Sequence, residues 1–381
     1  MGFKCGIVGL PNVGKSTLFN ALTETSSAEA ANYPFCTIEP NSGIVSVPDK
    51  RLTSLSELVQ SQKVIPAQMQ FVDIAGLVSG ASKGEGLGNK FLSHIREVDA
   101  IIHVVRCFEN TDITHVENSI NPLRDSEIID TELMLADLES LERQTQNMSK
   151  KIKSNDTDAK NDLDLMKKLS QFLSDGIPIR LVDLTDEEIK IIKTFNLLTS
   201  KPVLYACNVN EDDASNGNDF TKKIFDKAKT ENCDAIIISG SIESEIAMLD
   251  ETEKKEFLKD LNLEESGLNR LIRTGFNLLD LITFFTVGPK ETRAWTIKNN
   301  STAPEAAGII HTDFEKGFIR AETISYDDYL NFKSEQAVKD AGRMRVEGAD
   351  YIVKDGDVFH FRFNVWLELN YEWNYRNYSK R

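Results

Sequence analysis

A glycine-containing segment near the start of the chain constrains its fold more than any other feature. Residues 9–16 read Gly-Leu-Pro-Asn-Val-Gly-Lys-Ser, between an apolar, strand-like run at 4–8 and a helix-like run at 17–23. In this context backbone N–H groups curl around the β-phosphate, Lys15 neutralises phosphate charge and the Ser16 hydroxyl ligates Mg²⁺. The segment therefore predicts a P-loop that binds a purine nucleoside triphosphate with Mg²⁺.

Short apolar runs rich in Val and Ile alternate with helical stretches up to residue 239. The runs are 4–8, 43–47, 69–74, 100–107, 203–209 and 235–239. Most are continuously apolar, which is typical of strands buried on both faces of a parallel sheet. Alternation with helices predicts an α/β domain with a doubly wound, mainly parallel sheet.

The pattern changes between residues 128 and 173, where no strand-like run occurs. Apolar side chains step by four and three along two stretches on either side of a polar break at 154–156. This spacing predicts an antiparallel helical hairpin of coiled-coil type, inserted as a projecting arm. The alternative is a pair of ordinary amphipathic helices packed on the sheet.

From residue 281 the sequence predicts a small mixed α+β domain, with strands at 281–286, 292–297, 317–324 and 358–365. The expected limits are 1–127 and 199–280 for the nucleotide-binding domain, 128–198 for the arm, 281–365 for the C-terminal domain and 366–381 for a tail.

Two further segments complete the expected phosphate and metal site. Asp73 and Gly76 form Asp-x-x-Gly at the end of an apolar run, where the carboxylate can hold Mg²⁺ through water and the Gly76 N–H can sense the γ-phosphate. Thr37, in the preceding polar loop, is the candidate hydroxyl that closes on Mg²⁺; the alternative is a surface threonine. Leu77 occupies the place where many GTPases carry a water-orienting glutamine, so the attacking water needs another partner.

The base-recognition element departs from the Asn-Lys-x-Asp of GTPases. The run 203–207 leads into Asn208-Val209-Asn210-Glu211, with valine in place of lysine and glutamate in place of aspartate. These replacements remove a reason to prefer guanine. A rival register starts at Asn210 and ends at Asp213. Ser239 and Gly240, after the next strand-like run, stand where backbone N–H groups commonly meet the base.

Composition narrows the classes of partner. The 381 residues carry a net charge of −16, which argues against non-specific nucleic-acid binding and DNA recognition by the whole molecule. The part from residue 281 holds 14 basic and 15 acidic residues and is nearly neutral, so RNA contacts are expected there. Five cysteines without metal-ligand spacing suggest free thiols in the cytoplasm, and no segment is apolar enough to cross a membrane.

Taken together, these motifs resemble the Obg-like ATPase family, also called YchF. The resemblance rests on residues 9–16, 33–41, 73–77 and 208–211, and on 311–321 and 350–358 towards the C-terminus. It implies a GTPase-type domain, an inserted helical arm and a ubiquitin-like β-grasp (TGS) domain. It also implies ATP preferred over GTP, a hydrophobic replacement of the catalytic glutamine at Leu77, and association with ribosomes. The tail from residue 366 departs from the family pattern.

The sequence hypothesis is therefore a monomeric, ribosome-associated ATPase switch, with a conventional GTPase or a nucleotide-sensing scaffold as alternatives. His115 is the candidate water-positioning residue, and the alternative is a solvated loop histidine. Asn12 is a candidate K⁺ ligand beside the phosphates, and the alternative is a capping role. The expected catalytic residues are Lys15, Gly76 and His115, and the expected metal ligands are Ser16, Thr37 and Asp73. The expected nucleotide-binding residues are Asn12, Val13, Gly14, Lys15, Ser16, Thr17, Asn208, Val209, Glu211, Ser239 and Gly240.

Overall fold

The computed structural model describes residues 3–30, 41–74, 87–110, 119–151 and 157–364. The chain divides into two compact units. The first unit comprises the residues up to 48 together with 68–279, and the second comprises 49–67 together with the residues from 280 onward.

A six-stranded sheet organises the first unit, in the order β2-β4-β1-β5-β6-β7. Its strands are β1 (Lys4–Val8), β2 (Ser42–Ser46), β4 (Gln68–Asp73), β5 (Ala100–Arg106), β6 (Val203–Asn208) and β7 (Asp234–Ile238). All neighbours are parallel except the edge strand β2, which runs antiparallel to β4. Every residue of β5 and β6 is buried, which explains why their sequences are mostly apolar. The expected doubly wound, mainly parallel α/β fold is confirmed.

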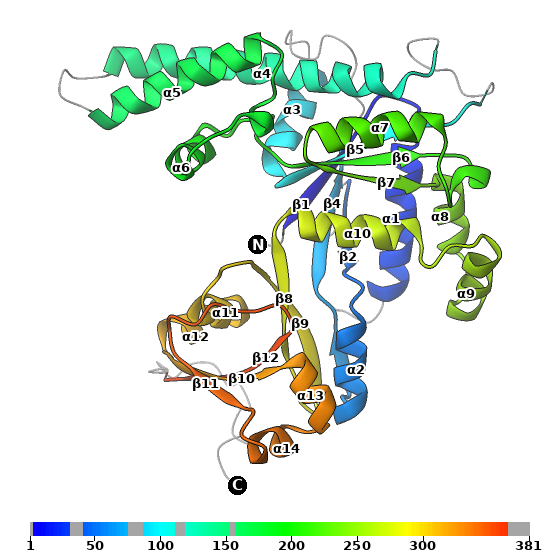
Figure 1. Cartoon of the computed structure of the whole chain (residues 1–381), viewed down its shortest axis with the longest axis vertical. Helices are drawn as coiled ribbons and strands as arrows, with labels where there is room; N and C mark the ends of the chain where they lie inside the picture. The colour runs from blue at the N-terminus through cyan, green and yellow to red at the C-terminus, as the bar shows by residue number, and fades with distance from the viewer. Residues whose placement is uncertain (1–2, 31–40, 75–86, 111–118, 152–156, 365–381) are drawn as a thin grey trace. The chain divides into compact units, whose positions relative to one another are not determined.

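Nine α-helices accompany this sheet in the described part of the first unit (Figure 1). They are α1 (Lys15–Ala30), α3 (Leu87–Glu97), α4 (Pro122–Lys151), α5 (Thr157–Ser174), α6 (Asp186–Phe195), α7 (Asp219–Thr230), α8 (Gly240–Ile246), α9 (Glu251–Asp260) and α10 (Gly267–Leu278). Within the described residues, no helix combines the length and hydropathy needed to cross a membrane.

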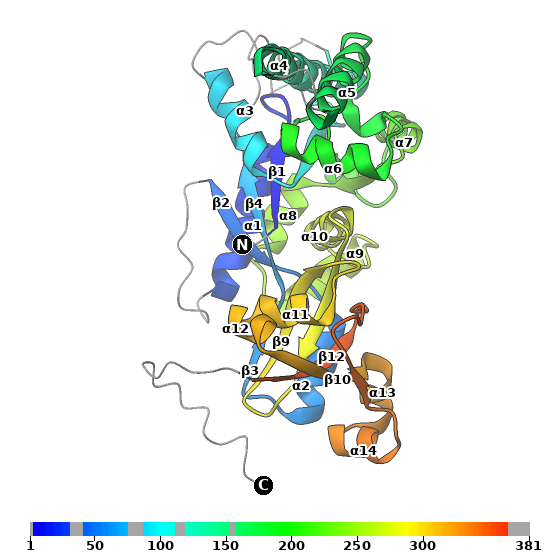
Figure 2. The ribbon, with the colours of Figure 1, turned by 90° about the vertical axis from the view of Figure 1, so that its left-hand side faces the viewer.

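Helices α4 and α5 lie side by side and antiparallel, as Figures 1 and 2 show. Their shared core also takes in α6 and contains Met134, Leu141, Met166, Leu169 and Leu173, which are positions of the expected apolar seam. The limit expected at residue 128 falls inside α4, because this helix begins at Pro122 and continues unbroken into the hairpin.

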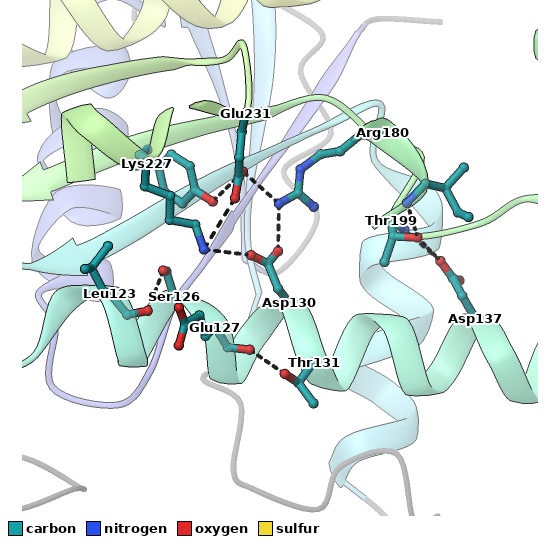
Figure 3. A network of polar contacts seen from close by, with 12 residues as sticks. Leu123, Ser126, Glu127, Asp130, Thr131, Asp137, Arg180, Thr199, Lys227 and Glu231 are labelled. Atoms are coloured by element: carbon teal, nitrogen blue, oxygen red, sulfur yellow. Dashed lines mark hydrogen bonds and ion pairs between the residues drawn. The ribbon is translucent and has the colours of Figure 1, made fainter. Parts of the chain in front are cut away.

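A buried network of charges attaches the first turns of α4 to the sheet unit (Figure 3). The Arg180 guanidinium lies 2.9 Å from Asp130 and 3.1 Å from Glu231, and Lys227 lies 3.3 Å from Asp130 and 3.4 Å from Glu231. Two turns further along α4, Asp137 accepts hydrogen bonds from the backbone N–H groups of Leu198 and Thr199 and from the Thr199 hydroxyl. The carboxylates at the base of the hairpin are therefore paired, whereas Nε and Nη1 of Arg180 are buried without a partner among the described residues.

The second unit is built on another six-stranded sheet, in the order β11-β10-β12-β8-β9-β3. Its strands are β3 (Lys63–Ile65), β8 (Leu281–Thr286), β9 (Glu291–Lys298), β10 (Phe318–Ser325), β11 (Arg345–Glu347) and β12 (Asp357–Phe363). Its helices are α2 (Lys50–Val59), α11 (Ala303–Ile310), α12 (Thr312–Lys316), α13 (Tyr326–Phe332) and α14 (Glu335–Asp340). Four of the strands match those expected from the sequence, whereas β3 and β11 have three residues each and were not foreseen.

The segment 49–67 departs from the expected limits, which assign it to the nucleotide-binding domain. Strand β3 pairs with β9, and the Ser61 hydroxyl bonds to Gly288 and Thr292. Arg51 of α2 makes an ion pair with Asp355 at 2.7 Å. These contacts group α2 and β3 with the C-terminal unit. That unit therefore includes a segment that lies between β2 and β4 in the sequence.

Candidate nucleotide site

The P-loop lies between the end of β1 and the start of α1, where its backbone adopts conformations that suit glycine. Gly14 has φ +94°, and a Cβ built on it would lie 2.2 Å from the Asn208 amide nitrogen. Asn12 also has positive φ, at 62°, which asparagine tolerates better than most residues. Helix α1 begins immediately afterwards at Lys15, and Ser16 and Thr17 are exposed in its first turn. A helix start of this kind presents backbone N–H groups and a favourable dipole to an anion.

Lys15 is the buried cation of this site. Only 7% of it is exposed, and its ammonium donates a hydrogen bond to the Leu10 carbonyl at 2.8 Å. Burial lowers the pKa of Lys15 to about 8, against the opposing effect of Asp73. Because a buried ammonium is poorly solvated, it gains from a nearby phosphate.

Asp73, the last residue of β4, provides a carboxylate that interacts electrostatically with Lys15. Its Oδ1 atom is buried and has no hydrogen-bond partner among the residues that the structure describes. Burial raises the pKa of Asp73, and the charge of Lys15 opposes that rise. An unpartnered carboxylate oxygen fits a hard divalent cation, directly or through water, as does the exposed Ser16 hydroxyl.

No group of three or more His, Cys, Asp or Glu side chains among the described residues could hold a metal ion by itself. The remaining expected site residues, Thr37, Gly76, Leu77 and His115, lie outside the described part of the chain.

Asn208 joins the P-loop to the segment after β7. Its amide nitrogen donates to the Val13 carbonyl at 2.9 Å, and its Oδ1 accepts the Gly240 N–H at 3.0 Å. Ser239 beside it is buried and bonds to the Ser241 hydroxyl at 3.0 Å. The structure thus brings Val13, Gly14, Asn208 and Gly240 together.

The two registers of the base-recognition element differ in their surroundings. Val209 is buried and donates its N–H to Ile238, and Glu211 is exposed in the 3-10 turn Glu211–Asp213. The Asp213 carboxylate accepts a hydrogen bond from Asn218 at 2.7 Å. The register that starts at Asn208 is favoured, because Asn208 contacts the P-loop and the alternative aspartate is engaged elsewhere.

Two residues of this region were missed from the sequence. Asn218 is the N-cap of α7 and links three segments. Arg106 is buried at the end of β5, where it donates to the carbonyls of Phe108 and Asn110. A helix-capping pattern is recognisable in residues 217–221. The longer-range contacts of Asn218, in contrast, cannot be recognised from the neighbouring sequence.

Comparison with known proteins gives one family over the whole described chain. Residues 4–136 match the family model described as "50S ribosome-binding GTPase", and residues 281–364 match the YchF-GTPase_C model, described as a protein of unknown function. The Ribosome-binding ATPase YchF of Pasteurella multocida is 59% identical over 365 residues, covering 96% of this chain and all of the relative. That of Bacillus subtilis is 53% identical over 367 residues, with the same coverage.

A solved structure extends the likeness to three dimensions. The Schizosaccharomyces pombe YchF GTPase superposes with a TM-score of 0.87 at 40% identity, covering 95% of this chain and 98% of the other. The match covers residues of both units and is not confined to the P-loop.

Proposed function

Because the chain belongs to the YchF family and is a P-loop nucleotide hydrolase, we propose that it is an ATP-preferring, Mg²⁺-dependent switch that binds ribosomes in the cytoplasm and acts in translation or its regulation. The relatives are named as ribosome-binding ATPases, which supports the ribosome as a partner and ATP as a substrate. The observation that carries the proposal is the combination of Lys15, which is buried, and Asp73, whose buried Oδ1 has no partner among the described residues; the two groups suit a phosphate and a cation.

In the proposed mechanism, Lys15 binds the β- and γ-phosphates, and Ser16 and Asp73 hold Mg²⁺ directly or through water. A bound Mg²⁺ would neutralise charge on the phosphates. The P-loop N–H groups orient the phosphates for in-line attack by water. We propose His115 as the residue that positions this water, Thr37 and Gly76 as the groups that sense the γ-phosphate, and Asn12 as a K⁺ ligand.

The preference for ATP is proposed from the residues beside Asn208. Glu211 is longer than the aspartate that accepts two hydrogen bonds from guanine, and buried Val209 cannot supply the contact made by lysine. Calorimetric titration of ATP and GTP under the same conditions tests this proposal. Clearly tighter binding of GTP would favour a conventional GTPase of the same fold.

The ribosome contact is proposed for the C-terminal unit and the α4–α5 hairpin. Lys339 and Arg343 of the second unit are exposed and suit phosphate contacts, whereas Arg345 is engaged with Asp357 and Tyr351. Lys316 and Arg320 are exposed too, although Arg320 lies 3.6 Å from Glu322. Lys339 and Arg343 are therefore the better probes of RNA contact.

Sedimentation with ribosomes in ATP-analogue and ADP states tests this role. We expect binding to fall with salt, and a Lys339→Glu, Arg343→Glu variant to bind less. These surface changes are preferable to truncation after Asp280, which would also deprive α2 and β3 of their packing partners. Turnover measured with and without ribosomes separates an enzyme from a scaffold whose binding alone matters.

A further inference from the structure

We propose that Asn218 is a positioning residue for base recognition, which holds the turn carrying Glu211 against the end of β5. This inference rests on the proposed function, because it concerns how the same site recognises its nucleotide. Asn218 itself lies in the first unit, directly before α7.

All four hydrogen-bonding positions of the Asn218 side-chain amide are used. Its Oδ1 accepts the N–H groups of Phe220 at 3.0 Å and Thr221 at 3.1 Å, which caps α7. Its Nδ2 donates to the Cys107 carbonyl at 2.8 Å and to the Asp213 carboxylate at 2.7 Å. Two donors face the oxygen and two acceptors face the nitrogen, so the neighbours fix the orientation of this amide.

Asp213 transmits this contact to the base-recognition turn. Its carbonyl accepts the Gly217 N–H at 2.7 Å, and its own N–H donates to Asn210 at 3.1 Å. Glu211 opens the same 3-10 turn, and the Ala214 N–H donates to the Glu211 carbonyl at 3.1 Å. The exposed Glu211 thus lies in a short turn that is held in place at Asp213, whose carboxylate accepts the hydrogen bond from Asn218.

Cys107 connects the same amide to the P-loop side of the sheet. Its N–H donates to the Asn208 carbonyl at 2.8 Å, while its carbonyl accepts from Asn218. The Asn208 side chain in turn bonds to Val13 and Gly240. A continuous hydrogen-bonded path therefore fixes Glu211 relative to Asn208, through Asp213, Asn218 and Cys107.

The capping and bridging roles of Asn218 can be separated by substitution. Asn218→Ser keeps an oxygen that can cap α7 but removes both donors to the bridge. Asn218→Asp also keeps the cap, but it turns an acceptor oxygen towards two other acceptors. If bridging positions the base-recognition turn, the aspartate variant is the more defective of the two, although both retain the cap.

The test compares binding of Mg²⁺-ATP, Mg²⁺-GTP and Mg²⁺-tripolyphosphate, the last of which has no base, by calorimetry on the full chain. We expect Asn218→Ser to weaken binding of the preferred nucleotide about fivefold and Asn218→Asp to weaken it further, with tripolyphosphate changed less than about twofold. Asp213→Ala removes the bridge and leaves the α7 cap in place, and should reproduce the Asn218→Ser result. Asp250→Ser, a cap exchange on α9, should alter none of the three affinities.

Equal weakening of nucleotide and tripolyphosphate would overturn the proposal, because it would indicate a general loss of structure. Unchanged nucleotide affinity in both Asn218→Asp and Asp213→Ala would overturn it as well. Tighter binding of GTP than ATP by the unaltered protein contradicts only the proposed ATP preference. The Asn218 proposal is judged by the loss relative to tripolyphosphate, whichever nucleotide binds better.

Discussion

Two groups of charges in the first unit differ in how their carboxylates are paired. At the base of the hairpin, the carboxylates of Asp130 and Glu231 each pair with both Arg180 and Lys227 (Figure 3), although the buried Nε and Nη1 atoms of Arg180 have no hydrogen-bond partner among the described residues. At the P-loop, the Lys15 ammonium donates to the Leu10 carbonyl, and Asp73 Oδ1 has no partner among the described residues.

The difference shows which buried charges serve the fold and which serve a ligand. Desolvated ions are tolerated where partners offset the loss of hydration, as they do around Asp130. At the P-loop the described residues offset the lost hydration only in part. Burial lowers the pKa of Lys15 and raises the pKa of Asp73, and both shifts favour the neutral form of the side chain. Bound phosphate and cation would supply the missing partners.

The largest expected effect comes from removing the unsatisfied cation. Lys15→Met should lower ATP hydrolysis by about 1,000-fold or more, because electrostatic stabilisation of the transferred phosphoryl group is lost. Single-turnover assays with saturating Mg²⁺-ATP would measure the change. The matched control is Lys227→Met in the hairpin network, which should leave hydrolysis by the folded protein within a fewfold of its original rate. Similar loss in both variants would erase the distinction between the two groups.

The next effect concerns the paired group. Arg180→Met should destabilise the protein by about 3 kcal/mol, because Asp130 and Glu231 lose a buried partner. Thermal or urea unfolding without nucleotide measures the change. Arg143→Met is the control: its ion pair with Glu139 is exposed on both sides, so the expected loss is under about 1 kcal/mol. Equal losses in the two variants would show that burial does not determine how much these ion pairs contribute to the free energy of unfolding.

The sequence predicted the P-loop, and it predicted all the described strands except β3 and β11 to within one or two residues. The signal was clearest for β5 and β6, because strands buried at every position are mostly apolar. It predicted the hairpin from the periodic side chains that pack in its core. It did not reveal that 49–67 completes the C-terminal sheet, since β3 has three residues and its partner β9 begins more than 200 residues later. The bridge from Asn218 to Cys107 spans 111 residues and likewise has no local signature.

A smaller effect should appear in the pH dependence of the nucleotide-free protein. The folded-state pKa of Lys15 is lowered to about 8 from its usual 10.5, so the unfolded chain binds more protons between these values. The Lys15 contribution therefore opposes folding below pH 8 and is relieved as the pH rises from 8 to 10.5. The stability of the wild type relative to Lys15→Met should rise by about 2 kcal/mol over that interval.

Urea unfolding of both proteins across this range gives the difference directly. Groups other than Lys15 titrate in both proteins, so their contributions largely cancel in the comparison. A flat difference between pH 8 and 10.5 would mean that the buried lysine carries its charge without penalty, and the incomplete pairing at the P-loop would lose its thermodynamic basis.

The smallest expected effect comes from making the same neutral substitution at Asp137, which is buried, and at Asp73, whose Oδ1 atom is buried. Asp137 accepts three hydrogen bonds from Leu198 and Thr199, so Asp137→Asn turns an NH₂ group towards a donor and should destabilise the protein by about 2 kcal/mol. Asp73 Oδ1 has no such partner among the described residues, so Asp73→Asn should leave nucleotide-free stability unchanged or raise it by up to about 1 kcal/mol.

The same Asp73 variant should lose much of the extra stabilisation that Mg²⁺ adds to bound ATP, because a neutral amide holds the cation weakly. Unfolding scans without ligand, with ATP and EDTA, and with ATP and Mg²⁺ measure both quantities. Strong destabilisation of the nucleotide-free Asp73→Asn protein would show that Asp73 serves the fold, and would place it with Asp137 on the paired side of the comparison.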